Sequence, residues 1–262
     1  MKDGGPSDDA GRDACATQRT SGAGLCACAG PAPRASRLAP SYRALIFDFD
    51  GLIMDTELPE FQSWQEIYEE HGCTLPIDLW AECIGTAPNV FDPFEYLEAQ
   101  IHRPVDRDPI RIRRRRRHQE LIALQAPLPG LETYLADAKR LGLKVAVASS
   151  SPREWVHGHL ERIRLRPNFV CLKCAGDVAQ VKPDPSLYRL ALEELEVQPH
   201  EAIAFEDSAH GVAAARGAGI YCVAVPNAMT CHLNLDHASL RLSSLADVPL
   251  EALLAKLSKS GG

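Results

Sequence analysis

The chain has 262 residues, 45% of them apolar and 24% charged, with a net charge of −7 and a pI near 5.7. This composition is typical of a folded globular protein, and the acidic total gives no reason to expect a nucleic-acid partner. The sequence has no apolar run of the roughly 20 residues that a membrane span needs, and it begins without the basic and apolar segments of a secretory signal. We therefore expect a cytoplasmic protein with no membrane partner.

The nine cysteines are an odd number, scattered along a chain long enough to build its own core. This usage indicates reduced thiols rather than a disulfide framework. Cys171 and Cys174 form a CxxC pair, which can serve redox chemistry or supply half of a zinc site. No second CxxC or His pair lies at zinc-finger spacing, and residues 170–172 have the pattern of a buried strand. We expect the pair to pack in the core, as free cysteines usually do.

From residue 43 onward, short unbroken apolar runs alternate with segments of helical spacing. Unbroken runs are typical of parallel strands that are covered on both faces. Residues 131–141 and 187–195 carry apolar side chains at the spacing of an amphipathic helix. This alternation predicts an α/β fold with a Rossmann-like, doubly wound parallel sheet. The predicted strands are residues 44–47, 144–148, 169–172, 202–205 and 221–225.

One long stretch, residues 57–125, has helical patterns only, which predicts a helical cap inserted after the first strand. Its first helix has Phe61, Trp64, Ile67 and Tyr68 on one face and ends at Gly72, and further helices are expected around residues 79–84, 92–100 and 109–125. Residues 1–40 are rich in Gly, Ala, Ser, Pro and Asp, which predicts a disordered tail. The core then comprises residues 41–56 and 126–262, with hinges near residues 56–57 and 127–130.

Polar side chains follow the predicted strands at the points where the strands end. Ligands of open parallel sheets bind beyond the carboxyl ends of the strands, so these side chains are the candidate site. Four separate segments deliver acids, hydroxyls and a lysine to this edge of the sheet. They are Asp48 and Asp50 after the first strand, Ser149 and Ser150 after the second, Glu206 and Asp207 after the fourth, and Lys182 in a loop before a helix.

These segments resemble the four motifs of the haloacid dehalogenase superfamily. They are the sequence FDFDGLIMDTE at residues 47–57, Ser149, Lys182 within VKPDP, and FEDS at residues 205–208. A lone DxD is a weak signal, whereas four motifs in order, each at a predicted strand end, are specific. The resemblance extends from about residue 42 to residue 253. It is closest to the branch with a helical cap, which includes β-phosphoglucomutase and many phosphatases of small metabolites.

The resemblance implies a Mg²⁺ site and covalent catalysis. Asp48 and Asp207 would hold Mg²⁺ through their carboxylates and Asp50 through its backbone carbonyl, with Glu206 in the metal shell or just outside it. The physical reason is that a divalent ion with oxygen ligands lets several carboxylates approach a phosphate dianion. Asp48 would attack phosphorus and form an aspartyl-phosphate.

The remaining roles follow from the same resemblance. Asp50 would act as general acid and base. Lys182 would neutralise charge, and the hydroxyl of Ser149 would bind the phosphoryl group. Ser150 and Ser208 serve either as ligands or as turn residues. Asp55 and Thr56 are expected to hold the loop and cap the first helix of the insertion, and His210 to be local scaffolding.

Three functions remain open, and the sequence favours one of them. Asp50 favours phosphoester chemistry over dehalogenation, because the dehalogenases lack this second Asp. Residues 57–127 contain no Lys, whereas phosphonate-cleaving relatives and β-phosphoglucomutases use a lysine in the cap. We therefore expect a phosphatase of a small phosphorylated metabolite, as a monomer or weak dimer. A phosphosugar mutase is the alternative, and a non-catalytic binding protein the second alternative.

The run Arg111 and Arg113–Arg117 is an unusual local feature. The expected explanation is a solvated helix face, with Ile110, Leu121, Ile122 and Leu124 turned inward. A nucleic-acid patch would need interleaved aromatic residues, which the run lacks. A third possibility is that one or two of these arginines face the cleft and attract an anionic substrate.

Overall fold

The computed structural model describes residue 1 and residues 42–81 and 91–260. The described residues leave out residues 2–41, which hold nearly all of the predicted tail, and the last three residues of the helix predicted around residues 79–84. Among the residues that are described, no helix is both long enough and apolar enough to cross a bilayer.

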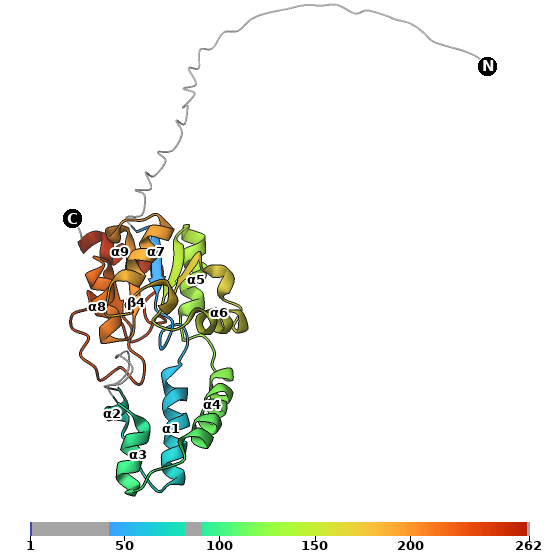
Figure 1. The fold of residues 1–262 in the computed structure, drawn as a ribbon. Coiled ribbons are helices and arrows are strands. Elements are labelled where there is room, and N and C mark those ends of the chain that lie inside the picture. Colours follow the sequence, from blue (N-terminus) through green and yellow to red (C-terminus); the bar gives the residue numbers. More distant parts are fainter. Residues whose placement is uncertain (2–41, 82–90, 261–262) are drawn as a thin grey trace, which may run out of the picture. The chain divides into compact units, whose positions relative to one another are not determined.

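A six-stranded parallel sheet forms the centre of the core (Figure 1). β1 (Ala44–Phe47) lies between β2 (Lys144–Ala148) and β4 (Ala202–Glu206). Phe47 is in register with Val147 and with Phe205, so these three strands end at the same level. The outer strands are β3 (Cys171–Lys173) beside β2, and β5 (Tyr221–Ala224) and β6 (Leu240–Arg241) beyond β4. The predicted parallel sheet is confirmed.

Alternate strand residues pack on opposite faces of the sheet. Leu45 and Phe47 belong to a cluster with α5 (Leu131–Leu141), α6 (Arg153–Arg162) and α9 (Leu250–Ser260). Ala44 and Ile46 belong to a second cluster with α7 (Ser186–Leu195) and α8 (Ala209–Gly217). Helices on both faces explain why the strands read as unbroken apolar runs.

One predicted strand needs correction, and one strand of the sheet was not predicted. The third strand begins at Cys171 rather than at residue 169, because Arg166–Asn168 form a short 3₁₀ helix and Val170 is 55% exposed. β6 was not predicted, since two residues are too few to give an apolar run. Cys171 and Cys174 are buried free thiols in the two core clusters, which confirms core packing of the CxxC pair.

In the described part of the segment between β1 and β2 there are four helices besides α5. We call them the cap helices: α1 (Glu57–Glu70), α2 (Ile77–Ala81), α3 (Pro93–Ile101) and α4 (Arg107–Ala123). They group together in Figure 1 and have an apolar cluster of their own, which includes Phe61, Trp64, Tyr68, Phe94 and Leu97. The predicted helical insertion is thus present.

The start of α1 differs from the prediction in one residue. The Asp55 carboxylate accepts a hydrogen bond from the Leu58 amide at 3.0 Å, as a capping side chain should. The Thr56 side chain makes no capping hydrogen bond, and its hydroxyl is buried without a partner among the described residues. Asp55 alone therefore caps the helix.

The two connections between the cap helices and the core run side by side. Met54 forms an isolated antiparallel bridge with Pro127, and the Leu128 amide donates to the Ile53 carbonyl at 2.9 Å. The Arg162 guanidinium of α6 donates to the carbonyls of Ala123 and Gln125, at 3.1 and 3.0 Å. These contacts fix where the chain leaves and re-enters the core.

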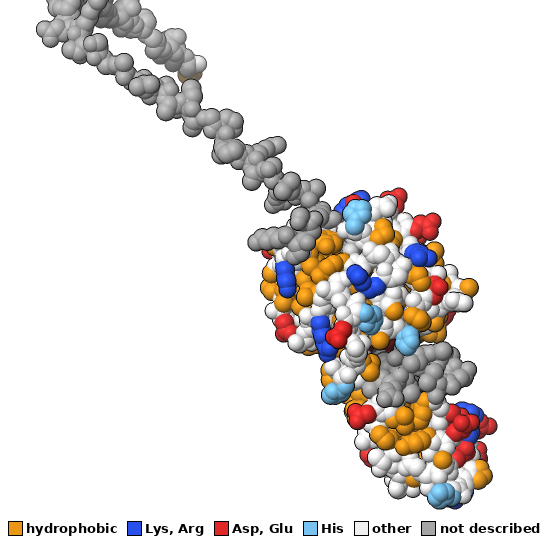
Figure 2. All heavy atoms as spheres, turned by 90° about the vertical axis from the view of Figure 1, so that its left-hand side faces the viewer, with side chains coloured by type: hydrophobic (Ala, Val, Ile, Leu, Met, Phe, Trp, Pro, Cys, Tyr) orange, Lys and Arg blue, Asp and Glu red, His pale blue; other side chains and the backbone are white. Residues whose placement is uncertain are grey.

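Most arginines of the run on α4 pair with carboxylates, and three of these carboxylates lie on α1. Arg114 pairs with Glu60 at 2.6 Å and Arg117 with Glu66 at 2.9 Å. On the face shown in Figure 2, basic and acidic side chains of the described residues are interspersed. These pairs favour the interpretation as a charged helix face, with Ile110 and Ile122 turned inward as expected. Leu124, however, is exposed.

Candidate active site

A cavity of about 290 Å³ opens beyond the carboxyl ends of β1, β2 and β4. The core and the cap helices both contribute to its wall. The lining residues from the core are Asp48, Asp50, Thr56, Ser150, Ser151, Trp155, Lys182, Asp207, Ser208 and His210, and those from the cap helices are Glu57, Glu60 and His118.

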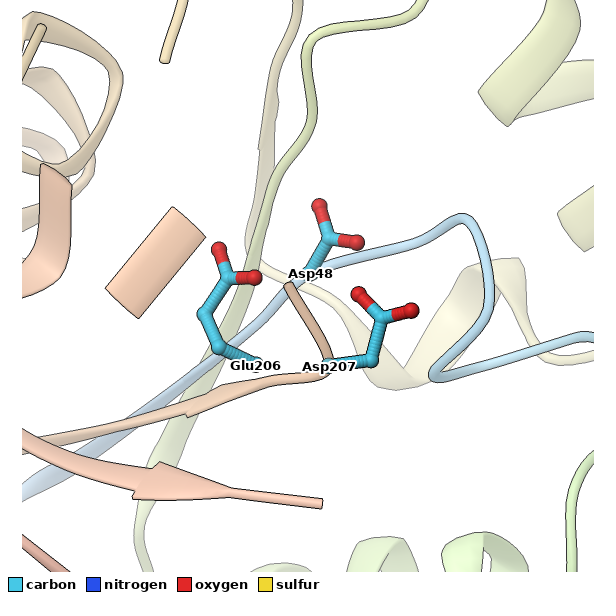
Figure 3. A group of neighbouring side chains, drawn as sticks. All are labelled: Asp48, Glu206 and Asp207. Atoms are coloured by element: carbon cyan, nitrogen blue, oxygen red, sulfur yellow. The ribbon is translucent and has the colours of Figure 1, made fainter. Parts of the chain in front are cut away.

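Three carboxylates from two strand ends meet at the floor of this site (Figure 3). Asp48 follows β1, Glu206 is the last residue of β4, and Asp207 comes next. One oxygen of each lies within 4.8 Å of the others, and all three residues are buried. Buried carboxylates this close repel one another unless cations or protons compensate them.

Lys182 supplies one of the compensating charges. Its ammonium group pairs with the Asp48 carboxylate and lies 2.7 Å from Glu206 Oε1. Burial lowers the pKa of Lys182, but the charges of Asp48 and Glu206 raise it by more, so the group stays protonated. The Tyr188 hydroxyl also donates to Glu206, and its ring lies 5.3 Å from the ammonium nitrogen. Tyr188 has no signal in the motifs, since it lies inside α7.

One lysine does not balance the cluster. Burial raises the pKa of Asp48 to about 8, although Lys182 beside it acts in the opposite direction. Burial and the charge of Asp48 also raise the pKa of Asp207 well above its ordinary value. Glu206 Oε2 is buried without a hydrogen-bond partner among the described residues. An all-oxygen donor set with excess negative charge and an unpartnered oxygen fits a hard divalent cation such as Mg²⁺.

Close backbone approaches shape this cluster. At Gly51 the φ angle is +76°, and a Cβ there would lie 2.3 Å from Asp207 Oδ2. At Gly211 a Cβ would lie 1.8 Å from Glu206 Oε2. Both positions therefore need glycine for the carboxylates to occupy their places.

Asn227 holds Asp207 and was not predicted from the sequence. Its side-chain amide donates to Asp207 Oδ2 at 2.8 Å and to the Gly51 carbonyl at 3.1 Å. Its own oxygen accepts from the amides of Met229 and Thr230. Asn227 lies three residues beyond β5, so its place after the fifth apolar run is the signal that could have found it.

The Asp50 carboxylate also lines the cavity, and it accepts three hydrogen bonds. Ser151 Oγ donates to it at 2.6 Å, Ser149 Oγ at 3.3 Å and Trp155 Nε1 at 2.9 Å. Ser149 is fully buried, whereas Ser150 is exposed and lines the cavity. Ser151 and Trp155 were not predicted as site residues.

Ser208 of the fourth motif and His210, two residues beyond it, have defined places. The Ser208 side chain accepts from the Gly211 amide at 3.1 Å and caps α8, which is the turn role allowed by the sequence. His210, expected to be scaffolding, lines the cavity.

Comparison with known proteins agrees with this geometry. Residues 45–225 match the family described as haloacid dehalogenase-like hydrolase. The "Putative phosphatase YhcW" of Bacillus subtilis (strain 168) is 48% identical over 215 residues, which cover 82% of this chain and 97% of that protein. The "Phosphorylated carbohydrates phosphatase" of Thermotoga maritima is 33% identical over 181 residues, covering 68% and 82% of the two chains.

A solved structure gives the same result for the fold. The crystal structure of CbbY from Rhodobacter sphaeroides in complex with phosphate has 28% identity, a TM-score of 0.59, and coverage of 79% of this chain and 96% of that one. The family match spans more than half of the chain, and the phosphatase of Bacillus subtilis matches almost over its full length. The chain therefore belongs to the haloacid dehalogenase-like hydrolases.

Proposed function

We propose that the protein is a Mg²⁺-dependent phosphatase of small phosphorylated metabolites that works through an aspartyl-phosphate on Asp48. The observation that carries the proposal is the position of the Asp48 carboxylate, which lies between Lys182 and Asp207 at the floor of a cavity. A phosphomonoester placed there would meet a nucleophile, a fixed positive charge and a cation site at once.

The proposed metal ligands are the carboxylates of Asp48 and Asp207 and the backbone carbonyl of Asp50. Glu206 lies beside them, with one oxygen on Lys182 and the other without a partner among the described residues. When bound, Mg²⁺ would neutralise the carboxylates and polarise the phosphoryl oxygens. Asn227 would keep the Asp207 carboxylate in its place through the hydrogen bond described above.

Two displacements at phosphorus account for hydrolysis. Asp48 attacks phosphorus in line, and the bond between phosphorus and the ester oxygen breaks while Asp50 gives that oxygen its proton. A water molecule then attacks the aspartyl-phosphate, Asp50 takes the proton of the water, and Asp48 and phosphate are released. Lys182 balances the negative charge throughout. We assign phosphoryl binding to the hydroxyl group of Ser150, which lines the cavity, and to that of the buried Ser149, which would turn from Asp50 to a phosphoryl oxygen.

Part of the wall of the cavity comes from Thr56, from Glu57 and Glu60 of α1, and from His118 of α4. We infer that these residues face the organic part of the substrate. We also infer that the protein has two domains, a cap of residues 57–125 and a core of residues 41–56 and 126–262. The hinges between them would lie near residues 56–57 and 127–130. The volume of the cavity supports a small metabolite over a macromolecular substrate.

A panel of phosphorylated sugars, phosphoglycolate and nucleotides, with Mg²⁺ or with EDTA, tests the proposal. We expect Mg²⁺-dependent release of phosphate by the wild type, and none by Asp48→Asn. The second candidate function is a phosphosugar mutase, because the chain is 28% identical to the β-phosphoglucomutase of Bacillus subtilis. An isomerised sugar phosphate as the product, in place of free phosphate, would establish this function instead. Folded protein without any turnover would contradict both.

A further inference from the structure

Trp155 of α6 makes a contact that the reaction outlined above does not use. Its indole N–H donates to Asp50 Oδ1 at 2.9 Å, while Ser151 donates to the other oxygen at 2.6 Å. A carboxylate held at both oxygens by donors from one segment of the core cannot rotate without breaking a hydrogen bond. Charge-assisted hydrogen bonds of this kind are among the stronger ones in proteins.

Trp155 is held in turn by a residue of the cap. The ring of His118, on α4, is stacked with the indole at a centroid distance of 5.8 Å and an angle of 18°. The His159 ring, on α6 itself, makes a T-shaped contact with the indole, at a centroid distance of 4.2 Å and an angle of 75°. Trp155 therefore has one aromatic neighbour from the core and one from the cap helices.

His118 has a fixed place of its own. Its Nδ1 lies 3.2 Å from Glu60 of α1, and Glu60 also pairs with Arg114. Burial lowers the pKa of His118, so the ring that stacks on Trp155 is neutral at neutral pH. A continuous series of contacts thus runs from α1 through His118 and Trp155 to the Asp50 carboxylate.

We propose that Trp155 is a positioning residue that orients the Asp50 carboxylate toward the leaving-group oxygen. His118 makes this orientation depend on the position of the cap helices. The inference rests on the proposed function, because it concerns the proton that Asp50 transfers. Proton transfer requires the Asp50 carboxyl oxygen to lie within hydrogen-bonding distance of the leaving-group oxygen. A carboxylate that rotates freely is in this position for only part of the time. Packing of α4 against α6 would then orient the general acid Asp50 as well as enclose the substrate.

Trp155→Phe tests the hydrogen bond, because it keeps an aromatic ring for His118 and removes only the N–H donor and part of the ring. The matched control is Trp80→Phe in α2, since the Trp80 N–H has no hydrogen-bond partner among the described residues. The readout is kcat/KM for an alkyl phosphate, whose leaving group needs a proton, and for p-nitrophenyl phosphate, whose leaving group does not.

For Trp155→Phe we expect kcat/KM on the alkyl ester to fall by about tenfold more than on the nitrophenyl ester. The inhibition constant of inorganic phosphate should stay unchanged, because the phosphoryl site is intact. His118→Ala keeps the donor but loses the stack, and it should show the same selective loss to a smaller extent. Equal losses on the two esters, or no loss beyond that of Trp80→Phe, would overturn the role of Trp155. An unaltered ratio in His118→Ala would overturn the role of the cap.

A spectroscopic measurement tests the contact without any turnover. The indole N–H resonance of Trp155 is identified in a ¹H–¹⁵N spectrum as the peak that Trp155→Phe removes. We expect this peak to move in Asp50→Asn and in His118→Ala, while the Trp80 peak stays in place. If the chemical shift of the Trp155 peak is unchanged in both variants, the inference is refuted. Wild-type protein that hydrolyses neither ester with Mg²⁺ would count against the proposed function, and the spectrum would still decide the contact.

Discussion

Replacing Lys182 by methionine should destabilise the protein strongly, because the ammonium group is the charge that compensates two buried carboxylates. The Lys182 side chain is 5% exposed and pairs with Asp48 and Glu206, which are themselves 9% and 0% exposed at their side chains. Methionine has a similar length and is apolar, so the substitution removes the charge with little change in packing.

The expected magnitude follows from this burial. Removing one partner of a buried ion pair costs about 3–5 kcal/mol, since the remaining charge stays buried without compensation. For a domain of this size that loss corresponds to a melting temperature lower by about 10 °C. The matched control is Lys173→Met, because Lys173, 17% exposed at its side chain, pairs at 3.2 Å with Glu194, which is 54% exposed. A pair with one partner in solvent is screened by water and contributes about 1 kcal/mol or less.

Urea denaturation in EDTA, above pH 8 where Asp48 is ionised, gives both free energies of unfolding without interference from bound metal. A second substitution, Glu206→Gln, should restore part of the stability that Lys182→Met loses, because it removes one of the uncompensated charges. If Lys182→Met loses no more than Lys173→Met, the lysine does not hold the cluster together and the electrostatic account of the site is wrong.

Three further results are expected. Because the pKa of Asp48 is raised to about 8, the metal-free protein loses stability as pH rises from about 4 through 8, whereas Mg²⁺ binding needs the ionised form. A Mg²⁺ concentration a hundredfold above the Kd at pH 8 should therefore raise the melting temperature by roughly 5–10 °C at pH 8. The same concentration should raise it by less at pH 5.5, and an equal rise at both pH values would contradict this. Asn227→Ala removes a hydrogen bond to Asp207 and should weaken Mg²⁺ binding about 10- to 100-fold in calorimetry; unchanged affinity would exclude that role. Gly211→Ala forces a Cβ against Glu206 and should cost about 1–3 kcal/mol in urea denaturation, and a neutral result would show that Glu206 can move aside.

The position of the site could be predicted from the sequence because it depends on strand ends. Asp48, Asp207 and Glu206 are each within two residues of an apolar run, and parallel strands bring such residues to one edge. Lys182 was found through its motif, although its loop lies between β3 and α7 and its direction is set only by the folded core.

The residues that hold the site could not be predicted in this way. Trp155 reaches Asp50 from inside α6, and Tyr188 reaches Glu206 from inside α7, so their contacts depend on how each helix is rotated on the sheet. Apolar periodicity gives the buried face of a helix but not which buried ring has a polar partner. Thr56 illustrates the same limit, because the adjacent Asp55 takes the capping role that either residue type could fill.

The central claim is that the Asp48 carboxylate bonds to phosphorus during turnover. Rapid acid quenching of the enzyme with Mg²⁺ and substrate, followed by peptide mass spectrometry, locates any phosphoryl group on the chain. We expect one hydroxylamine-sensitive phosphate on Asp48 in the wild type and none in Asp48→Asn. A phosphate on another side chain, or rapid turnover with no phosphorylated enzyme at any quench time, would contradict the account.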